Sequence, residues 1–162
     1  MRKLLLLFAL TTVWVTVYSQ KVVKNETDEF TGSKIKETSY VTISDGFNCF
    51  IRIVDDRRIL HVGFNSGDKM YTMEDGAEFM FKLENDSIIT LNNFELAVSE
   101  YISNQYYSHF LLRTRYRLPD EALNELKKHK IAKVRFITTD GYIERSVSKG
   151  NSEKLLKLFN LI

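Results

Sequence analysis

Residues that cross-link or interrupt a chain are scarce in this sequence: its 162 residues include one cysteine, one proline and seven glycines. A single cysteine excludes an internal disulfide, and with it the small secreted folds that depend on disulfides. The glycines stand singly, which excludes collagen-like repeats and glycine-rich phosphate loops. The remaining composition, 44% hydrophobic and 27% charged, is typical of one globular domain with a hydrophobic core.

Recognisable catalytic and metal-binding motifs are also missing. His61, His109 and His129 show no zinc-site spacing, and no serine stands in a G-x-S-x-G elbow. Most aspartates lie next to glycine or in other turn sequences, which favours a role in turn geometry. A carboxylate pair of the glycosidase type can still be present, because the sequence does not give carboxylate separations. We therefore identify no catalytic residue, no metal ligand and no cofactor, and the sequence leans against an enzyme without excluding one.

The first residues have the layout of an export signal. Arg2 and Lys3 precede an apolar run, and small residues stand at positions −3 and −1 of a cleavage site, Val17-Tyr18-Ser19. The run is short for a bilayer span, which needs ~20 residues. We expect residues 1–19 to be a cleaved signal peptide and the mature chain to be periplasmic or extracellular, with the membrane as a partner only during export. The alternatives are an uncleaved anchor and a buried first strand.

Cleavage changes the charge of the chain. The full sequence has 23 basic and 21 acidic residues, and without Arg2 and Lys3 it has 21 of each. A neutral protein gives no electrostatic reason to expect a nucleic-acid partner. The only tryptophan, Trp14, lies in the signal, so we expect tyrosine-type fluorescence from the mature protein.

Beyond a polar stretch at residues 20–34, expected to be a flexible N-terminal arm, hydrophobic and polar residues alternate with the period of two that is typical of strands. Turn sequences such as Asp45-Gly46 separate the runs, and such short connections favour antiparallel pairing. Cys49 lies on the apolar face of one run, which favours a buried small hydrophobe over an intermolecular bridge or a nucleophile. The expected strands are 35–43, 47–54, 57–64, 77–83, 87–92, 94–102, 109–118, 131–138 and 142–148.

Two segments have helical spacing instead. Pro119, Asp120 and Glu121 favour a helix start and predict a helix over 119–129, and Asn151 or Ser152 is the expected cap of a second helix at 152–161. Both are too short to be stable alone in water. The sequence therefore predicts one α+β domain over residues 35–162, with a mostly antiparallel meander sheet and the two C-terminal-half helices packed on one face.

Strand alternation gathers basic residues. In 109–118 most apolar side chains share one face, and the arginines lie on the other face together with Leu111. A two-residue turn at Asp140-Gly141 would pair Ile137 with Glu144, and the basic residues of 131–138 would then lie on the same sheet face as the arginines. The expected row on one sheet face is Arg113, Arg115, Arg117, Lys133 and Arg135. Such a row can hold carboxylate or sulfate groups by bidentate hydrogen bonds. The alternative is a solvated outer face neutralised by neighbouring glutamates.

A second candidate site is the segment 101–109, where Tyr101, Tyr106 and Tyr107 lie among serine, asparagine and glutamine. Flat amphipathic rings beside amides suit contacts with a sugar or a protein at low entropy cost. The alternative is a hairpin connection whose tyrosines pack on the edge of the domain.

Three segments resemble small exported proteins of Bacteroidetes-type Gram-negative bacteria. They are Tyr18-Ser19-Gln20 at the end of the signal, Asp28–Gly32 with Lys34–Thr38, and Ile131–Ile143. The resemblance covers the start and end of the chain, not its middle. It implies an exported location and a compact α+β fold, and it implies no catalytic residue and no ligand.

These observations favour an exported, non-enzymatic binding module whose ligand is unidentified, with an anionic glycan or an envelope protein as the expected partner. The alternative is a hydrolase acting on envelope or dietary polymers, and a third interpretation is a purely structural or stress-related envelope protein. The first two differ in what their sites require: an enzyme needs a cleft with convergent titratable groups, whereas a binding module needs an accessible apolar or aromatic surface.

Overall fold

The computed structural model describes residues 20–162, so the expected signal peptide at residues 1–19 lies outside the described residues. Strands dominate, and both helices lie in the C-terminal half, which confirms the predicted α+β class. The strands are β1 Val22–Thr27, β2 Lys34–Thr38, β3 Val41–Ser44, β4 Phe47–Val54, β5 Arg57–Gly67, β6 Thr72–Met73, β7 Glu78–Leu83, β8 Ile88–Asn92, β9 Ala97–Val98, β10 Glu100–Ser103, β11 Ser108–Arg117, β12 Ile131–Thr138 and β13 Gly141–Ser146. The helices are α1 Asp120–Lys128 and α2 Lys149–Phe159.

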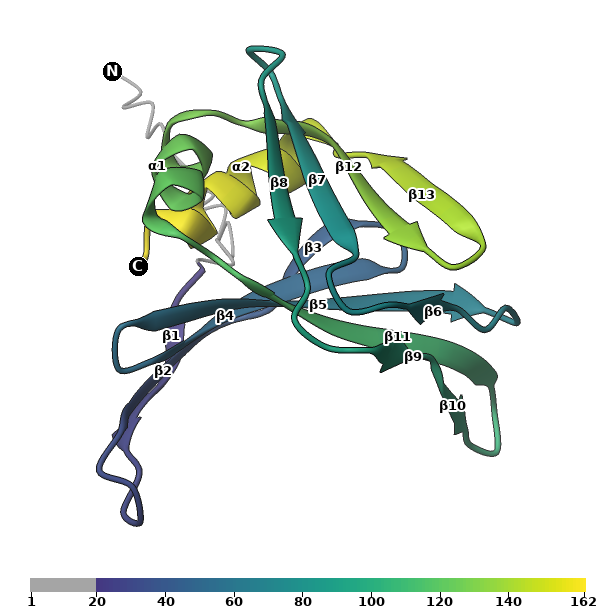
Figure 1. Cartoon of the computed structure of the whole chain (residues 1–162), viewed down its shortest axis with the longest axis horizontal. Coiled ribbons are helices and arrows are strands. Elements are labelled where there is room, and N and C mark those ends of the chain that lie inside the picture. The colour runs from purple at the N-terminus through teal and green to yellow at the C-terminus, as the bar shows by residue number, and fades with distance from the viewer. Residues whose placement is uncertain (1–19) are drawn as a thin grey trace, which may run out of the picture.

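The strands form two principal antiparallel sheets. A seven-stranded sheet has the order β1-β2-β4-β5-β11-β10, with β3 also paired to β4, and a four-stranded sheet has the order β13-β12-β7-β8. The short strands β6 and β9 pair with each other. In Figure 1 the seven-stranded sheet lies below, and the four-stranded sheet and both helices lie above it. One face of the seven-stranded sheet, here called the inner face, therefore meets these elements, and its other side is the outer face.

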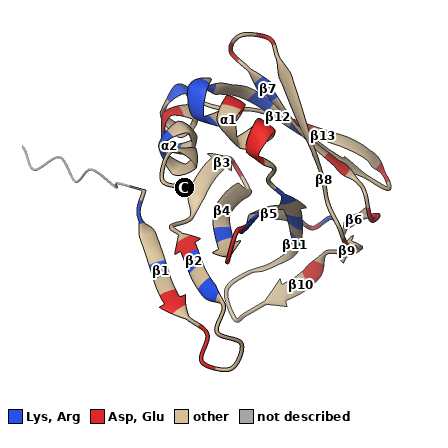
Figure 2. Cartoon of the chain, turned by 60° about the vertical axis from the view of Figure 1, so that its left-hand side comes forward, with Lys and Arg blue, Asp and Glu red and all other residues tan. Residues whose placement is uncertain are grey.

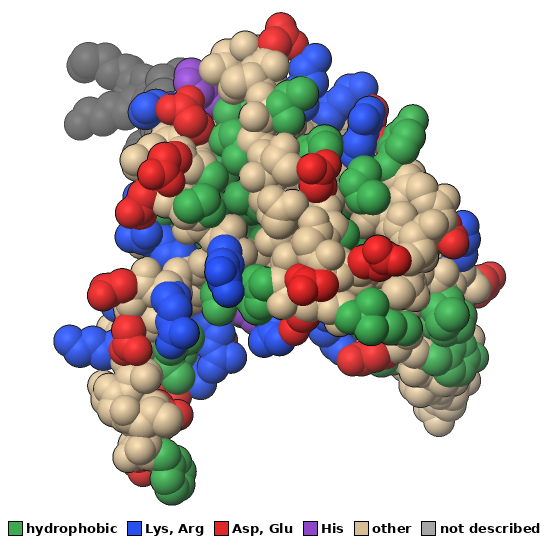
Figure 3. Space-filling model, viewed as in Figure 1, with side chains coloured by type: hydrophobic (Ala, Val, Ile, Leu, Met, Phe, Trp, Pro, Cys, Tyr) green, Lys and Arg blue, Asp and Glu red, His purple; other side chains and the backbone are tan. Residues whose placement is uncertain are grey.

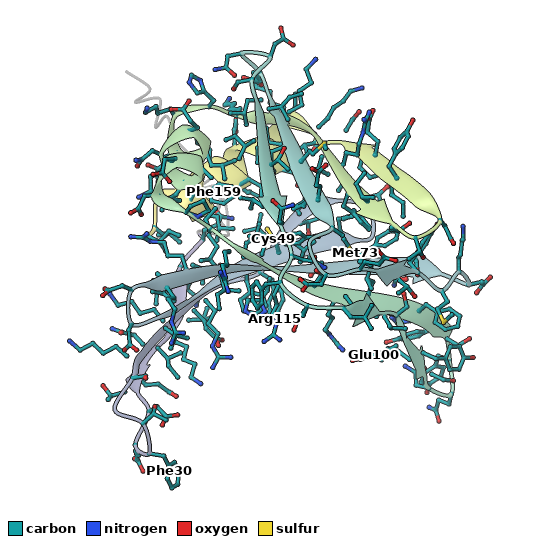
Figure 4. The ribbon with its side chains drawn as sticks, in the orientation of Figure 1. Phe30, Cys49, Met73, Glu100, Arg115 and Phe159 are labelled. Carbon is teal, nitrogen blue, oxygen red and sulfur yellow. The ribbon has the colours of Figure 1, made fainter. Side chains whose placement is uncertain are left out.

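The core fills the space between the inner face and the elements above it. Phe47 and Phe64 stack with ring centroids 4.2 Å apart, and Phe136 of the four-stranded sheet meets Phe47 edge-on at 5.0 Å. The side chain of Tyr116 is fully buried and packs on Phe79 at 5.2 Å. Figure 4 places Cys49, Met73 and Phe159 above the seven-stranded sheet. Aromatic side chains thus join the two sheets and the helices into one core.

Both helices begin at residues that favour a helix start, through charge in α1 and through a capping side chain in α2. Asp120 and Glu121 lie in the first turn of α1, and Lys127 and Lys128 lie in its last turn, so each charge favours the helix dipole. The second helix starts three residues before the predicted 152. Its cap is Ser148, whose hydroxyl accepts a hydrogen bond from the backbone N–H of Asn151.

The N-terminal region differs from its prediction. Residues 20–34 were expected to form a flexible arm, but Val22–Thr27 is strand β1, which pairs antiparallel with β2. Backbone hydrogen bonding to β2 stabilises this polar segment, which has almost no buried side chain of its own. The hairpin turn is fixed by Asp28, whose carboxylate accepts the backbone N–H groups of Phe30 and Thr31. These bonds lower the pKa of the Asp28 carboxyl.

The predicted strand 35–43 is also divided, into β2 and β3, and 94–102 is divided into β9 and β10. By contrast β4 and β12 have the predicted bounds. Among residues 20–162, neither helix has the length and apolar character needed to cross a membrane.

Candidate binding site on the outer face

The outer face of the seven-stranded sheet carries a hollow of about 700 Å³. Its lining includes Tyr40, Asn48, Phe50, His61, Arg113 and Arg115. Two hairpins, β1–β2 and β10–β11, extend beyond the core on either side of it, which gives the molecule the two-armed outline of Figure 3. Figure 4 shows Arg115 below the sheet between these arms, and Phe30 at the tip of one of them.

Strand register positions the centre of the hollow. Phe50 of β4 lies opposite His61 of β5, and His61 lies opposite Arg115 of β11. The Phe50 and His61 rings stack with centroids 4.4 Å apart and an interplanar angle of 18°, and the Tyr40 ring lies 4.7 Å from Phe50. Three strands and the residue before β3 thus build one row of neighbouring rings, here called the aromatic platform, that ends at a guanidinium.

Glycine makes room beside this platform. Gly63 lies opposite Asn48 on β4 and Arg113 on β11. A Cβ at Gly63 would lie 2.8 Å from Oδ1 of Asn48, so a side chain would push the amide aside and fill part of the hollow. The space between Asn48 and Arg113 therefore depends on Gly63.

An ion pair closes one side of the hollow. Both the Nε and Nη2 atoms of Arg115 donate to the carboxylate of Glu95, which follows β8 in a segment bridged to β11 by Asn93 and Tyr116. Hydrogen bonding to Arg115 lowers the pKa of the Glu95 carboxyl, and that carboxylate in turn raises the pKa of Arg115. The bidentate pair holds the guanidinium in a fixed orientation at the end of the platform.

His61 is neutral in this setting. Burial lowers the pKa of His61 to about 4, with further lowering from the charges of Arg115 and Arg52 and a smaller opposing effect of Glu95. Its Nε2 atom is buried without a hydrogen-bond partner among the described residues. The imidazole therefore acts as a flat, uncharged ring above pH 5 with one ring nitrogen still unsatisfied.

The predicted basic row does not exist as one surface. Arg113, Arg115 and Arg117 do share the outer face of the seven-stranded sheet, but Lys133 and Arg135 lie in the four-stranded sheet. The β12–β13 turn is Thr139-Asp140, so Glu144 lies opposite Arg135 and not opposite Ile137. Strand β12 pairs with the neighbouring β13 and with β7, and strand alternation cannot indicate the long-range pairing with β7.

Glutamates neutralise most of these basic side chains, as in the alternative interpretation. Arg113 pairs with Glu100, and Glu144 binds both Lys133 at 3.1 Å and Arg135 at 2.6 Å. Figure 2 shows acidic and basic residues interspersed over the strands. Arg117 differs, because its guanidinium lies over the Phe94 ring at 5.5 Å and has no carboxylate partner among the described residues.

The tyrosine segment is the end of the β10–β11 hairpin. Tyr101, Tyr106 and Tyr107 expose 61%, 82% and 59% of their surface, so they do not pack on the domain as the alternative interpretation expected. Tyr101 contacts the Phe110 ring at 5.2 Å, and Tyr107 contacts His109 at 5.6 Å. They do not line the hollow. They remain a second exposed aromatic surface on the arm beside it.

Sequence reasoning missed Tyr40, Phe50, His61 and Glu95 as site residues. The alternation with Cys49 and Ile51 did place Phe50 on the solvent side of its strand, but a single apolar residue there is common and does not by itself indicate a site. No local signal indicates Glu95, whose role depends on the pairing of distant segments.

The described residues also bear on the requirements of a metal site. Within residues 20–162 no group of three or more histidine, cysteine or acidic side chains is placed to hold a metal ion. Cys49 is buried in the core, and burial raises the pKa of its thiol to about 12, so it matches the expected small hydrophobe. Comparison of the chain with protein-family models, curated proteins and solved structures finds no match.

Proposed function

We propose that this protein is an exported, non-enzymatic binding module whose ligand, an anionic glycan, occupies the hollow on the outer face. The observation that carries the proposal is the aromatic platform of Tyr40, Phe50 and His61 beside two arginines in one cavity outside the core. The rings offer apolar contacts to a sugar, while amide and guanidinium groups can bind its hydroxyl and carboxylate groups.

Arg113 is the residue that we assign to the acidic group of the ligand. Its side chain and that of its partner Glu100 are both 59% exposed. An ion pair so exposed contributes little stability, so a ligand carboxylate can replace Glu100 at low cost. Arg115 has a positioning role in this proposal, because two of its three nitrogen atoms, Nε and Nη2, are already bound to Glu95.

The titratable groups of the hollow favour binding over the alternative hydrolase. Arg115 lowers the pKa of Glu95, so this carboxyl stays ionised and is a poor general acid. A pKa of about 4 makes His61 a weak general base at neutral pH. A concave cavity also suits a glycan better than an envelope protein, which needs a broader and flatter interface.

Calorimetric titration with an oligouronate and with a neutral oligosaccharide of the same length tests the proposal. We expect the oligouronate to bind more tightly, Phe50→Ala to weaken both ligands, and Arg113→Gln to weaken only the oligouronate, each by about tenfold. The matched controls are Tyr142→Ala, an exposed aromatic on the other sheet, and Lys154→Gln, an exposed cation on α2. Absence of saturable binding, or equal losses in the controls, contradicts the proposal.

Export has a separate test. Expressed with residues 1–19 in a Gram-negative host, the protein should be recovered outside the cytoplasm with Gln20 as its first residue. Because the only tryptophan is Trp14, that material should show tyrosine emission alone. A tryptophan band in the recovered protein contradicts cleavage.

A further inference from the structure

A second cavity lies on the same face, next to the aromatic platform along the direction of the strands. It is a groove of about 480 Å³, and its lining combines the apolar residues Val54, Ile59, Phe94, Leu118 and Pro119 with three arginines, Arg57, Arg58 and Arg117. Ile59 pairs with Arg117 of β11 and with Arg52 of β4, and it lies two residues before His61 on the same face of β5. The groove and the hollow are therefore neighbours on the sheet but share no lining residue.

The charges at this groove are not balanced. Arg58 pairs with Asp120 at the start of α1. Among the described residues, no carboxylate oxygen lies within 4.0 Å of the guanidinium of Arg57 or Arg117. Both side chains are exposed, and Phe94 holds Arg117 over its ring. Two uncompensated guanidinium groups thus border a largely apolar floor.

We propose that this groove binds an aliphatic carboxylate, a fatty-acid anion, with its chain along Val54, Ile59 and Phe94 and its carboxylate between Arg57 and Arg117. The planar guanidinium matches a carboxylate through paired hydrogen bonds, and the floor gains from the removal of apolar surface from water. A sugar placed here would leave hydroxyl groups without hydrogen-bond partners over the apolar floor. An acidic peptide would leave backbone amide groups without partners there. Charge complementarity and the apolar floor together select the acyl chain.

This inference does not depend on the proposed glycan site, because the two sites are built from different residues. It is tested by calorimetric titration of the purified protein with four probes: dodecanoate below its micelle concentration, dodecyltrimethylammonium, acetate, and a short peptide with glutamate next to leucine. We expect saturable binding of dodecanoate at one site, and at least tenfold weaker binding of the other three.

Variants assign the binding to the groove. The double change Arg57→Gln, Arg117→Gln should weaken dodecanoate at least tenfold, and Ile59→Thr should weaken it severalfold, while Lys154→Gln leaves it unchanged. If Ile59→Thr does not fold, the exposed arginine variants still decide the question. Equal affinity for acetate or for the cationic detergent overturns the inference, as does unchanged binding by the arginine variant. If the peptide binds more tightly than dodecanoate, the occupant of the groove is a peptide and the acyl-chain inference is overturned.

The two proposals fail separately. Dodecanoate binding that the arginine change weakens, with no oligouronate binding, overturns the glycan proposal and keeps the acyl site. Oligouronate binding with no binding of dodecanoate overturns the acyl site and keeps the glycan proposal.

Discussion

The two faces of the seven-stranded sheet are made by the same strands and differ in almost every property. On β4, Phe47 faces inward with 1% of its surface exposed, whereas Phe50 faces outward over the hollow. On β11, Tyr116 is fully buried while the neighbouring Arg115 and Arg117 are exposed. Alternation along a strand therefore lets one short segment supply both the core and the site, and changes on the two faces should separate stability from binding.

The largest difference is expected between the two phenylalanines of β4. Phe47→Ala removes a ring that contacts Phe64 and Phe136 and should lower the free energy of unfolding by about 3–5 kcal/mol. Phe50→Ala removes a half-buried ring and should cost about 1–2 kcal/mol while it weakens oligouronate binding. Urea unfolding of both variants measures this contrast. Similar losses of stability would show that the outer face is part of the core.

A change in the β3–β4 turn should have the next largest effect. Gly46 has φ +76°, and a Cβ there would lie 2.7 Å from the backbone oxygen of Asn65. Gly46→Ala should therefore lower the free energy of unfolding by about 1–3 kcal/mol. The matched change Gly32→Ala has a similar φ of +71° but no atom within 4 Å, so it should cost less. Thermal denaturation of the two variants separates the effect of the close approach to Asn65 from the effect of backbone strain. Equal melting temperatures would show that the close approach to Asn65 contributes nothing.

The pH dependence of stability tests the surroundings of His61 on the outer face. Its pKa falls from 6.5 to about 4 on folding, so the unfolded chain binds more protons between these values. Stability should be full above pH 6.5 and should fall by about 1–2 kcal/mol as the pH drops toward 4, after allowance for solvent screening. His61→Gln should reduce this slope. Urea unfolding at pH 4.5 and 7.5 measures the slope.

The smallest effect is expected for the exposed ion pair. Arg113→Gln should change the free energy of unfolding by less than about 1 kcal/mol, because both Arg113 and Glu100 are solvated. A double-mutant cycle with Glu100→Gln measures their coupling. A coupling above about 2 kcal/mol would mean that Glu100 cannot be displaced by a ligand, and it would remove Arg113 from the proposed site.

Local hairpins could be predicted from the sequence, because a two-residue turn fixes the register of its strands. Asp55-Asp56 joins β4 to β5, and this turn alone places Phe50 opposite His61. The same reasoning failed at β12–β13, where the turn lies one residue earlier than the Asp-Gly pair suggested. Alternation correctly separated Tyr116 from Arg115 and Arg117, since it depends only on period.

Long-range pairing could not be predicted. The contact of β5 with β11 joins segments about fifty residues apart, and it alone brings Arg115 to His61. Alternation also cannot tell which sheet a strand joins, so Lys133 and Arg135 were assigned to the wrong surface. The strand β1 was missed because an edge strand can be polar on both faces when backbone hydrogen bonds hold it.

The most direct measurement of the central claim is an NMR titration of the ¹⁵N-labelled protein with an oligouronate. The account predicts that the largest shift changes fall on Phe50, His61, Gly63, Arg113 and Arg115, on three adjacent strands of the outer face. Changes confined to Tyr106 and Tyr107 on the β10–β11 hairpin, or to the four-stranded sheet, would contradict it.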